Sequence, residues 1–130
     1  MSKISIKKRL KPILKENIKY KTTYKDIKKY FNYLNEGIFS NKLIRFNDVE
    51  IKSLKREKCI GQVVCEEDDK KGTATYKLEM DLFYDNKKDF LDTLAHEMVH
   101  LYQFMIKDNG NHNKLFYSYK SKLDYLGLKL

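Results

Sequence analysis

The chain has 130 residues, a length at which we expect one domain with its own hydrophobic core, spanning residues 1–130. Hydrophobic residues make up 42% of it and ten residues are tyrosines, which excludes an intrinsically disordered chain. The net charge of +9 indicates an affinity for polyanions, and no apolar run approaches the roughly 20 residues of a membrane span, so we expect no membrane contact.

The first 22 residues hold most of the excess charge, because eight lysine and arginine residues are opposed by Glu16 alone. Apolar side chains recur at helical spacing through this stretch, at Ile6, Leu10, Ile13, Leu14 and Ile18. Pro12 predicts a helix start or a kink among them. We therefore expect residues 1–22 to form a basic, helical amino-terminal segment.

This basic segment is a candidate surface for nucleic acid, because clustered cations attract phosphates. The cations that we expect to contact DNA, single-stranded or damaged, are Lys7, Lys8, Arg9, Lys11 and Lys15. The alternative is a solvated lysine face in a sequence rich in lysine, isoleucine and asparagine. Only three of the 27 basic residues are arginines, so base-specific recognition, which favours arginine, is not expected.

The cysteine content indicates a reducing compartment. The chain contains only Cys59 and Cys65, so it has no disulfide framework, although a single bridge between the two is an alternative. The lysine-dense start also lacks the apolar core of a secretory signal. We therefore expect a cytoplasmic protein, in the host cytoplasm if the chain is viral.

A helix followed by three strands is predicted in the middle of the chain. Thr23 and Asp26 resemble a capping pair, an apolar stripe follows them, and Gly37 is the expected stop. Strands are predicted from residue 48 to 54, from 60 to 65 and from 76 to 82, the last with the clearest alternation. Residues 66–72, which are acidic and end in glycine, are predicted to form an exposed hairpin loop.

The most informative pattern lies on the next predicted helix, which Asp85 or Asn86 is expected to cap. It reads His96-Glu97-Met98-Val99-His100 and lies in a broadly apolar stretch, which indicates a buried central helix. Residues i and i+4 of a helix share one face, so the two imidazoles can hold one metal ion, normally zinc. The glutamate between them can then act as a general base on a water molecule, which is the arrangement of a zinc peptidase.

A third ligand is expected from the segment after that helix. His112 is the only other histidine and follows the turn at residues 108–111. The competing ligand is Asp124, on a final helix predicted from about residue 113 to 126. Asp108 lies too close after His100, and the two cysteines lie in strand-like sequence. A tyrosine or a lysine is expected to assist at the carbonyl oxygen, although the sequence does not single one out.

Several ordered motifs between residues 23 and 126 resemble the SprT-like metallopeptidases, which are related to Spartan. The motifs are Tyr30–Asn35 with Ile38–Leu43, Ile60–Gln62, Thr93–Gln103 and Gly110–Phe116. The resemblance implies an α+β fold with a zincin (minigluzincin-like) core, in which helices pack on a small three-stranded sheet, mostly antiparallel or mixed. It also implies zinc on His96, His100 and His112, with Glu97 catalytic.

The same resemblance implies a function, since Spartan-type relatives cleave proteins that are crosslinked to DNA. This chain is similar to a short form without the zinc ribbon of longer members, and Asn113 replaces a glycine that is common in the family. By analogy with other zincins, an extended substrate is expected along the predicted strand at Gly61, Gln62, Val63 and Val64. The expected function is therefore a zinc endopeptidase that acts on protein substrates, including proteins bound or crosslinked to DNA.

Two alternatives remain. One is a peptidase that processes a specific protein independently of DNA. The other is a non-catalytic DNA-binding module with a structural zinc. Glu97 argues against the second alternative, because a structural site has no use for this carboxylate and usually closes its fourth coordination position.

Overall fold

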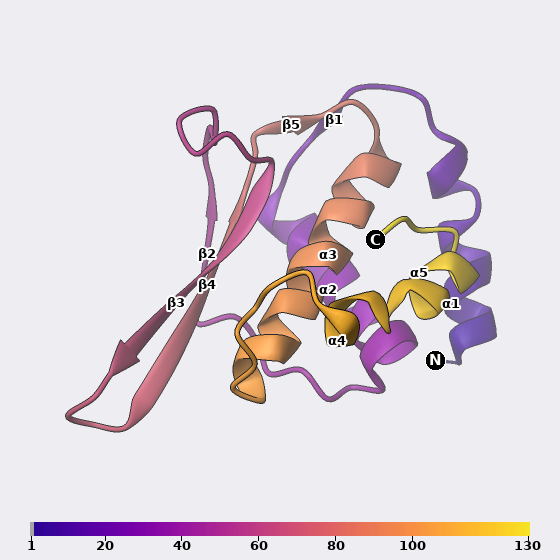
Figure 1. The fold of residues 1–130 in the computed structure, drawn as a ribbon. Helices are drawn as coiled ribbons and strands as arrows, with labels where there is room; N and C mark the ends of the chain where they lie inside the picture. Colours follow the sequence, from indigo (N-terminus) through magenta and orange to yellow (C-terminus); the bar gives the residue numbers. More distant parts are fainter. Residues whose placement is uncertain (1) are drawn as a thin grey trace.

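A long central helix, α3, lies between a small sheet and a group of helices in the computed structural model, which describes residues 2–130 (Figure 1). The helical elements are α1 (Lys3–Leu10), the 3₁₀ helix η1 (Ile13–Lys15), α2 (Tyr24–Phe39), α3 (Lys87–Met105), α4 (Lys114–Tyr117) and α5 (Lys120–Tyr125). The strands are β1 (Tyr20–Lys21), β2 (Asp48–Ile51), β3 (Gly61–Asp68), β4 (Thr73–Met80) and β5 (Phe83–Tyr84). The predicted α+β class is confirmed.

The main sheet has the strand order β2-β4-β3. β2 runs parallel to β4, whereas β3 and β4 form an antiparallel hairpin, so the sheet is mixed. β3 is an edge strand, because within residues 2–130 it pairs with β4 only. The free edge of β3 therefore lies on the side of the sheet near α3. This helix runs along one face of the sheet (Figure 1).

The hairpin loop is shorter than predicted. Residues 66–68 continue β3, since Glu66 pairs with Thr75 and Asp68 pairs with Thr73. The Asp68 carboxylate accepts hydrogen bonds from the backbone N–H groups of Lys70 and Lys71, at 3.1 and 3.2 Å, and closes the turn. The acidic composition of residues 66–72 correctly predicted that they are exposed, but it gave no indication that residues 66–68 pair with β4.

A second, two-stranded ribbon was not predicted. β1 pairs with β5 in antiparallel register, with Tyr20 opposite Tyr84. The Thr22 hydroxyl extends this contact by donating to the Asp81 carbonyl at 2.7 Å. The ribbon ties the amino-terminal segment to the residues that lead into α3.

The amino-terminal segment is helical only in part. α1 ends at Leu10 and η1 begins at Ile13, so Pro12 interrupts the helix as predicted. Beyond η1 the chain becomes extended, and Ile18, which was placed on the apolar face of a helix, is 71% exposed. The reason is the ribbon, which requires an extended backbone at Tyr20.

The predicted end of α2 at Gly37 is wrong, although its Thr23 cap is confirmed by a 3.1 Å bond from the Asp26 N–H. The helix continues to Phe39 and ends at Ser40, whose φ of 53° is left-handed. Gly37 is buried and has a packing role: a Cβ there would lie 3.3 Å from Ile6 and 3.4 Å from Leu126.

α3 supplies the centre of the core. The Asn86 side chain caps it by accepting from the Asp89 N–H at 2.8 Å, which decides between the two predicted caps. The completely buried apolar residues of α3 are Phe90, Leu91, Leu94, Ala95, Met98, Val99 and Leu101. No helix within residues 2–130 is long and apolar enough to cross a bilayer.

The final predicted helix is divided in two. α4 and α5 are separated at Ser118 and Tyr119, and Asn113 caps α4 by accepting from the Phe116 N–H at 3.0 Å. Phe116 and Leu123 are both buried. The break allows these two short helices to turn different residues toward the core.

We expect a measurable stability loss from Asn35→Ala. The buried Asn35 amide donates to the Leu43 carbonyl and accepts from the Leu43 N–H, each at 3.1 Å, and so holds the turn after α2. Loss of both partners should lower the free energy of unfolding by about 1–3 kcal/mol in urea titrations. Asn32→Ala, at an exposed position of α2, should change it by less than about 0.5 kcal/mol, and equal effects of the two changes would contradict this assignment.

Candidate metal centre

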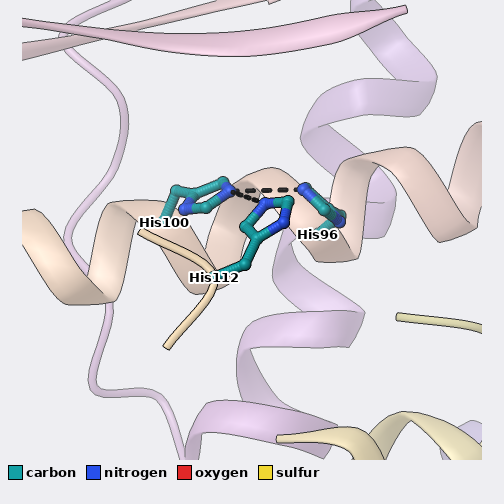
Figure 2. Close-up of side chains that lie close together, drawn as sticks. All are labelled: His96, His100 and His112. Carbon is teal, nitrogen blue, oxygen red and sulfur yellow. Dashed lines mark hydrogen bonds between the residues drawn. The ribbon is translucent and has the colours of Figure 1, made fainter. Parts of the chain in front are cut away.

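Three imidazole rings converge between α3 and the loop that follows it (Figure 2). His96 and His100 lie one turn apart on α3, and His112 approaches from the loop between α3 and α4. The Nε2 atom of His100 lies 3.2 Å from that of His96 and 3.3 Å from that of His112. The structure therefore brings the three predicted ligands together.

This spacing fits a zinc ion. Zinc–nitrogen distances of about 2.0–2.1 Å in a tetrahedral site place neighbouring nitrogen atoms about 3.3–3.4 Å apart. The three ligand atoms all lie within 4.8 Å of one another, and no other group of three or more histidine, cysteine or carboxylate side chains in residues 2–130 has metal-ligand spacing. Three nitrogen ligands with a fourth position left open is the donor set of a catalytic zinc site.

The electrostatics of the rings also suit a cation. Burial, together with the neighbouring His100 and His112, lowers the pKa of His96 to about 4. Burial lowers the pKa of His100 as well. Both rings are therefore neutral at pH 7, the form that binds metal.

An aromatic ring supports all three imidazoles. Phe116, which is 2% exposed, stacks on His112 with ring centroids 4.3 Å apart and on His100 at 5.0 Å. It meets His96 edge-on at 4.9 Å. One apolar side chain from α4 thus keeps water from one side of the cluster.

Glu97 is 6% exposed and, within residues 2–130, has no hydrogen-bond or ion-pair partner. Burial raises the pKa of its carboxyl to about 8 in the absence of a cation. Since no fully buried side-chain oxygen or nitrogen in residues 2–130 lacks a hydrogen bond, the unpaired Glu97 oxygens must remain open to a neighbouring hollow. A nearby metal cation would favour its ionised form.

Glu97 borders two hollows. The larger, of about 500 Å³, runs past His96, Thr93 and Gly61 toward the start of α3. The smaller, of about 290 Å³, lies between β3 and His100. An extended chain that passes through both hollows would cross Glu97.

Only part of the predicted substrate-binding strand lines the smaller hollow. Gly61, Gln62 and Val63 line it, whereas Val64 does not. Gly61 approaches α3 closely, since a Cβ there would lie 2.6 Å from the Thr93 methyl group and 3.5 Å from Glu97 Cγ. A side chain at this position would collide with Thr93, so either β3 or the Thr93 side chain would have to move.

The competing ligands lie elsewhere. The Asp124 carboxylate on α5 pairs with Lys120 at 2.7 Å and does not belong to the cluster. Asp108 accepts from the Gln103 amide on α3 and from the Gly110 N–H in the loop that carries His112. Cys59 and Cys65 are free thiols, which agrees with the preferred sequence interpretation.

Two residues that support the site were not predicted. Gln103 contacts His100 and Phe116 packs under all three rings. Gln103 follows His100 by three residues on the same helix, a spacing that places both on one face. That signal was present in the sequence, whereas the role of Phe116 depends on the fold.

A comparison with protein-family sequence models matches the part of the chain that contains the three histidines. The sequence model described as the SprT-like family matches residues 27–127, which is most of the chain. The match includes β3, all of α3 and the loop with His112, and it excludes α1 and β1. A search of curated proteins found no match.

The pH dependence of the free energy of unfolding of the metal-free protein should reveal the raised pKa of the Glu97 carboxyl group. Its pKa of about 8 exceeds the ordinary value of 4.5, so between these values the folded state binds more protons, and the free energy of unfolding falls as pH rises. His96 acts oppositely, but only below its ordinary pKa of 6.5. From pH 6.5 to 8 we expect a loss of about 1–2 kcal/mol that Glu97→Gln lacks.

The measurement is urea unfolding of both proteins in a chelator at several pH values within this window. Parallel stability curves for the two proteins would contradict the assignment of a raised pKa to Glu97.

Proposed function

The chain belongs to the SprT-like family, and we propose that it is a zinc-dependent endopeptidase with ligands His96, His100 and His112 and general base Glu97. The observation that carries the proposal is the unpartnered Glu97 carboxyl group beside three converging imidazoles. A structural zinc site would give no reason to keep a buried carboxyl group without a partner. This favours catalysis over the alternative of a non-catalytic module.

Each residue has one task in peptide hydrolysis. Zinc, when bound, supplies a Lewis acid that makes hydroxide available near neutral pH and polarises a carbonyl group. Glu97 takes a proton from the attacking water molecule, whose oxygen forms a bond to the carbonyl carbon. Glu97 then delivers this proton to the amide nitrogen as the carbon–nitrogen bond breaks, which leaves a carboxyl group and an amine.

The free edge of β3 is the proposed substrate-binding element. An extended peptide can add to an exposed strand through main-chain hydrogen bonds. Gly61, Gln62 and Val63 line the hollow that also contains His100 and Glu97, so a peptide on this edge would lie against the proposed catalytic residues. The absence of a side chain at Gly61 permits this close approach.

We also propose that the substrates include proteins bound or crosslinked to DNA. The supporting observation is that Lys7, Lys8, Arg9, Lys11 and Lys15 are all exposed. The segment is fixed to the domain, since Arg9 donates to the Tyr33 hydroxyl at 3.0 Å and the Lys7 ammonium lies 4.5 Å from the centre of the Tyr125 ring. The two free thiols support a cytoplasmic location.

A cleavage assay tests the proposal. The zinc-loaded protein is incubated with a DNA-binding protein, with and without single-stranded DNA, and the fragments are quantified. Glu97→Gln should lower the rate by about 10²–10⁴-fold and retain one zinc per chain, because it removes only the general base. His96→Ala should lose both zinc and cleavage.

The outcomes separate the candidate functions. Cleavage that requires DNA supports action on DNA-bound proteins. Cleavage that is equal without DNA supports a processing peptidase. DNA binding with no proteolysis by any zinc-loaded sample would contradict the endopeptidase proposal.

The contact between β3 and α3 gives a second prediction. Gly61→Ala would place a methyl group 2.6 Å from Thr93 Cγ2, so β3 or the Thr93 side chain beside Glu97 must move. A displacement of about 1 Å near the reacting groups can cost on the order of 100-fold in rate, so we expect at least a tenfold loss of cleavage with unchanged zinc affinity.

Thr93→Ser provides the matched rescue. Serine keeps the 2.8 Å bond from the residue 93 hydroxyl to the Asp89 carbonyl and removes the methyl group that collides. The double variant Gly61→Ala with Thr93→Ser should recover most of the activity. A double variant as slow as Gly61→Ala alone would show that the collision is not the cause.

A further inference from the structure

The Gln103 side chain is completely buried and makes four hydrogen bonds between α3 and the loop after it. Its Oε1 lies 2.8 Å from Nδ1 of His100. Its Nε2 lies 3.1 Å from Asp108 Oδ1, 2.8 Å from the Asn111 carbonyl oxygen and 3.2 Å from Asn113 Oδ1. One amide therefore contacts one proposed zinc ligand and the loop that carries another.

The orientation of this amide is fixed by its partners. The Asp108 carboxylate and the Asn111 carbonyl can only accept hydrogen bonds, so the Gln103 atom that faces them must be the NH₂ group. The remaining atom, Oε1, then faces His100. Since an amide oxygen only accepts, Nδ1 of His100 must carry the ring proton.

The proton position on His100 determines what its other nitrogen can do. A neutral imidazole carries one ring proton, so a proton on Nδ1 leaves the lone pair on Nε2. This Nε2 lies between those of His96 and His112, at 3.2 and 3.3 Å. The ring is thus held in the tautomer that can bind metal before any metal arrives.

The same amide anchors the loop around His112. Asp108 Oδ1 accepts from Gln103 and also from the Gly110 N–H and Asn113 Nδ2, each at 3.1 Å. Asn113 Oδ1, which accepts from Gln103, also caps α4 through the Phe116 N–H. His112 lies between these anchored residues, and Asn113 is one of the anchors.

We propose that Gln103 is a positioning residue that selects the His100 tautomer and places the His112 loop, so that the three-histidine site is formed in the metal-free protein. This inference rests on the proposed zinc site, but it concerns a residue that binds neither zinc nor substrate. Loss of the hydrogen bond to the other ring nitrogen of a ligating histidine typically weakens metal binding by about 10–100-fold.

Two substitutions separate the two roles. Gln103→Glu can still accept from His100 Nδ1–H but cannot donate to Asp108, Asn111 or Asn113, so it keeps the tautomer and releases the loop. Gln103→Met, of similar size, loses both functions. Asn35→Ala is the matched control, because it removes another buried amide that holds a turn and leaves the site contacts intact.

The experiment measures two quantities. Long-range ¹H–¹⁵N spectra of the metal-free proteins at pH 7.5 report which nitrogen of His100 is protonated, and competition with a chelating dye gives the zinc affinity. Wild type and Gln103→Glu should show the Nδ1–H tautomer, whereas Gln103→Met should not. Both Gln103 variants should bind zinc roughly 10–100-fold more weakly, and Asn35→Ala should bind like wild type.

The outcomes keep the inference and the proposed function apart. An Nε2–H tautomer of His100 in the wild-type protein overturns the inference without any variant. Unchanged zinc affinity in both folded Gln103 variants, or an equal loss in Asn35→Ala, also overturns it. If wild type binds no zinc at all, the proposed function fails, while the tautomer spectra still decide the role of Gln103.

Discussion

The loop between α3 and α4 must reverse the chain within a few residues and return His112 to the helix that carries His96 and His100. Lys107 and Gly110 adopt positive φ angles of 61° and 74° to make this reversal. A Cβ on Gly110 would lie 2.8 Å from the Phe104 ring, so the loop passes closely over the end of α3. Hydrogen bonds to Gln103 and Asp108 then fix it. The geometry of the cluster depends on this reversal, because only a tightly held loop brings a third imidazole to the helix.

The opposite wall of the site depends on a different kind of contact. β3 approaches α3 at Gly61, beside Thr93 and Glu97, where no side chain separates strand from helix. The strand is held there by Tyr84, whose hydroxyl donates to the Ile60 carbonyl and accepts from the Asp81 N–H. Tyr84 belongs to the β1–β5 ribbon, so the basic amino-terminal segment, the ribbon and the free edge of β3 form one connected structure. A ligand on the basic segment would therefore bind a part of the protein that contacts the wall of the site.

The sequence predicts the histidine cluster better than it predicts the structure that supports the cluster. The spacing of His96 and His100 is a local property of one helix, and His112 is the only other histidine, so the cluster could be named in advance. The alternation ending at Leu82 likewise predicted the central strand. By contrast, the role of Gly37 depends on Ile6 and Leu126, which are remote in sequence. A two-residue ribbon and an amide network in an irregular loop have no periodic signal, so tertiary contacts alone determine them.

The proposed function requires that His96, His100 and His112 hold one cation together and leave a position open beside Glu97. The most direct measurement is a structure of the protein crystallised with zinc, with anomalous scattering to locate the metal. We expect one anomalous peak about 2.0–2.1 Å from the Nε2 atoms of all three rings. A peak bound by only two of the rings, closed by a fourth protein ligand, or located away from the cluster would contradict it.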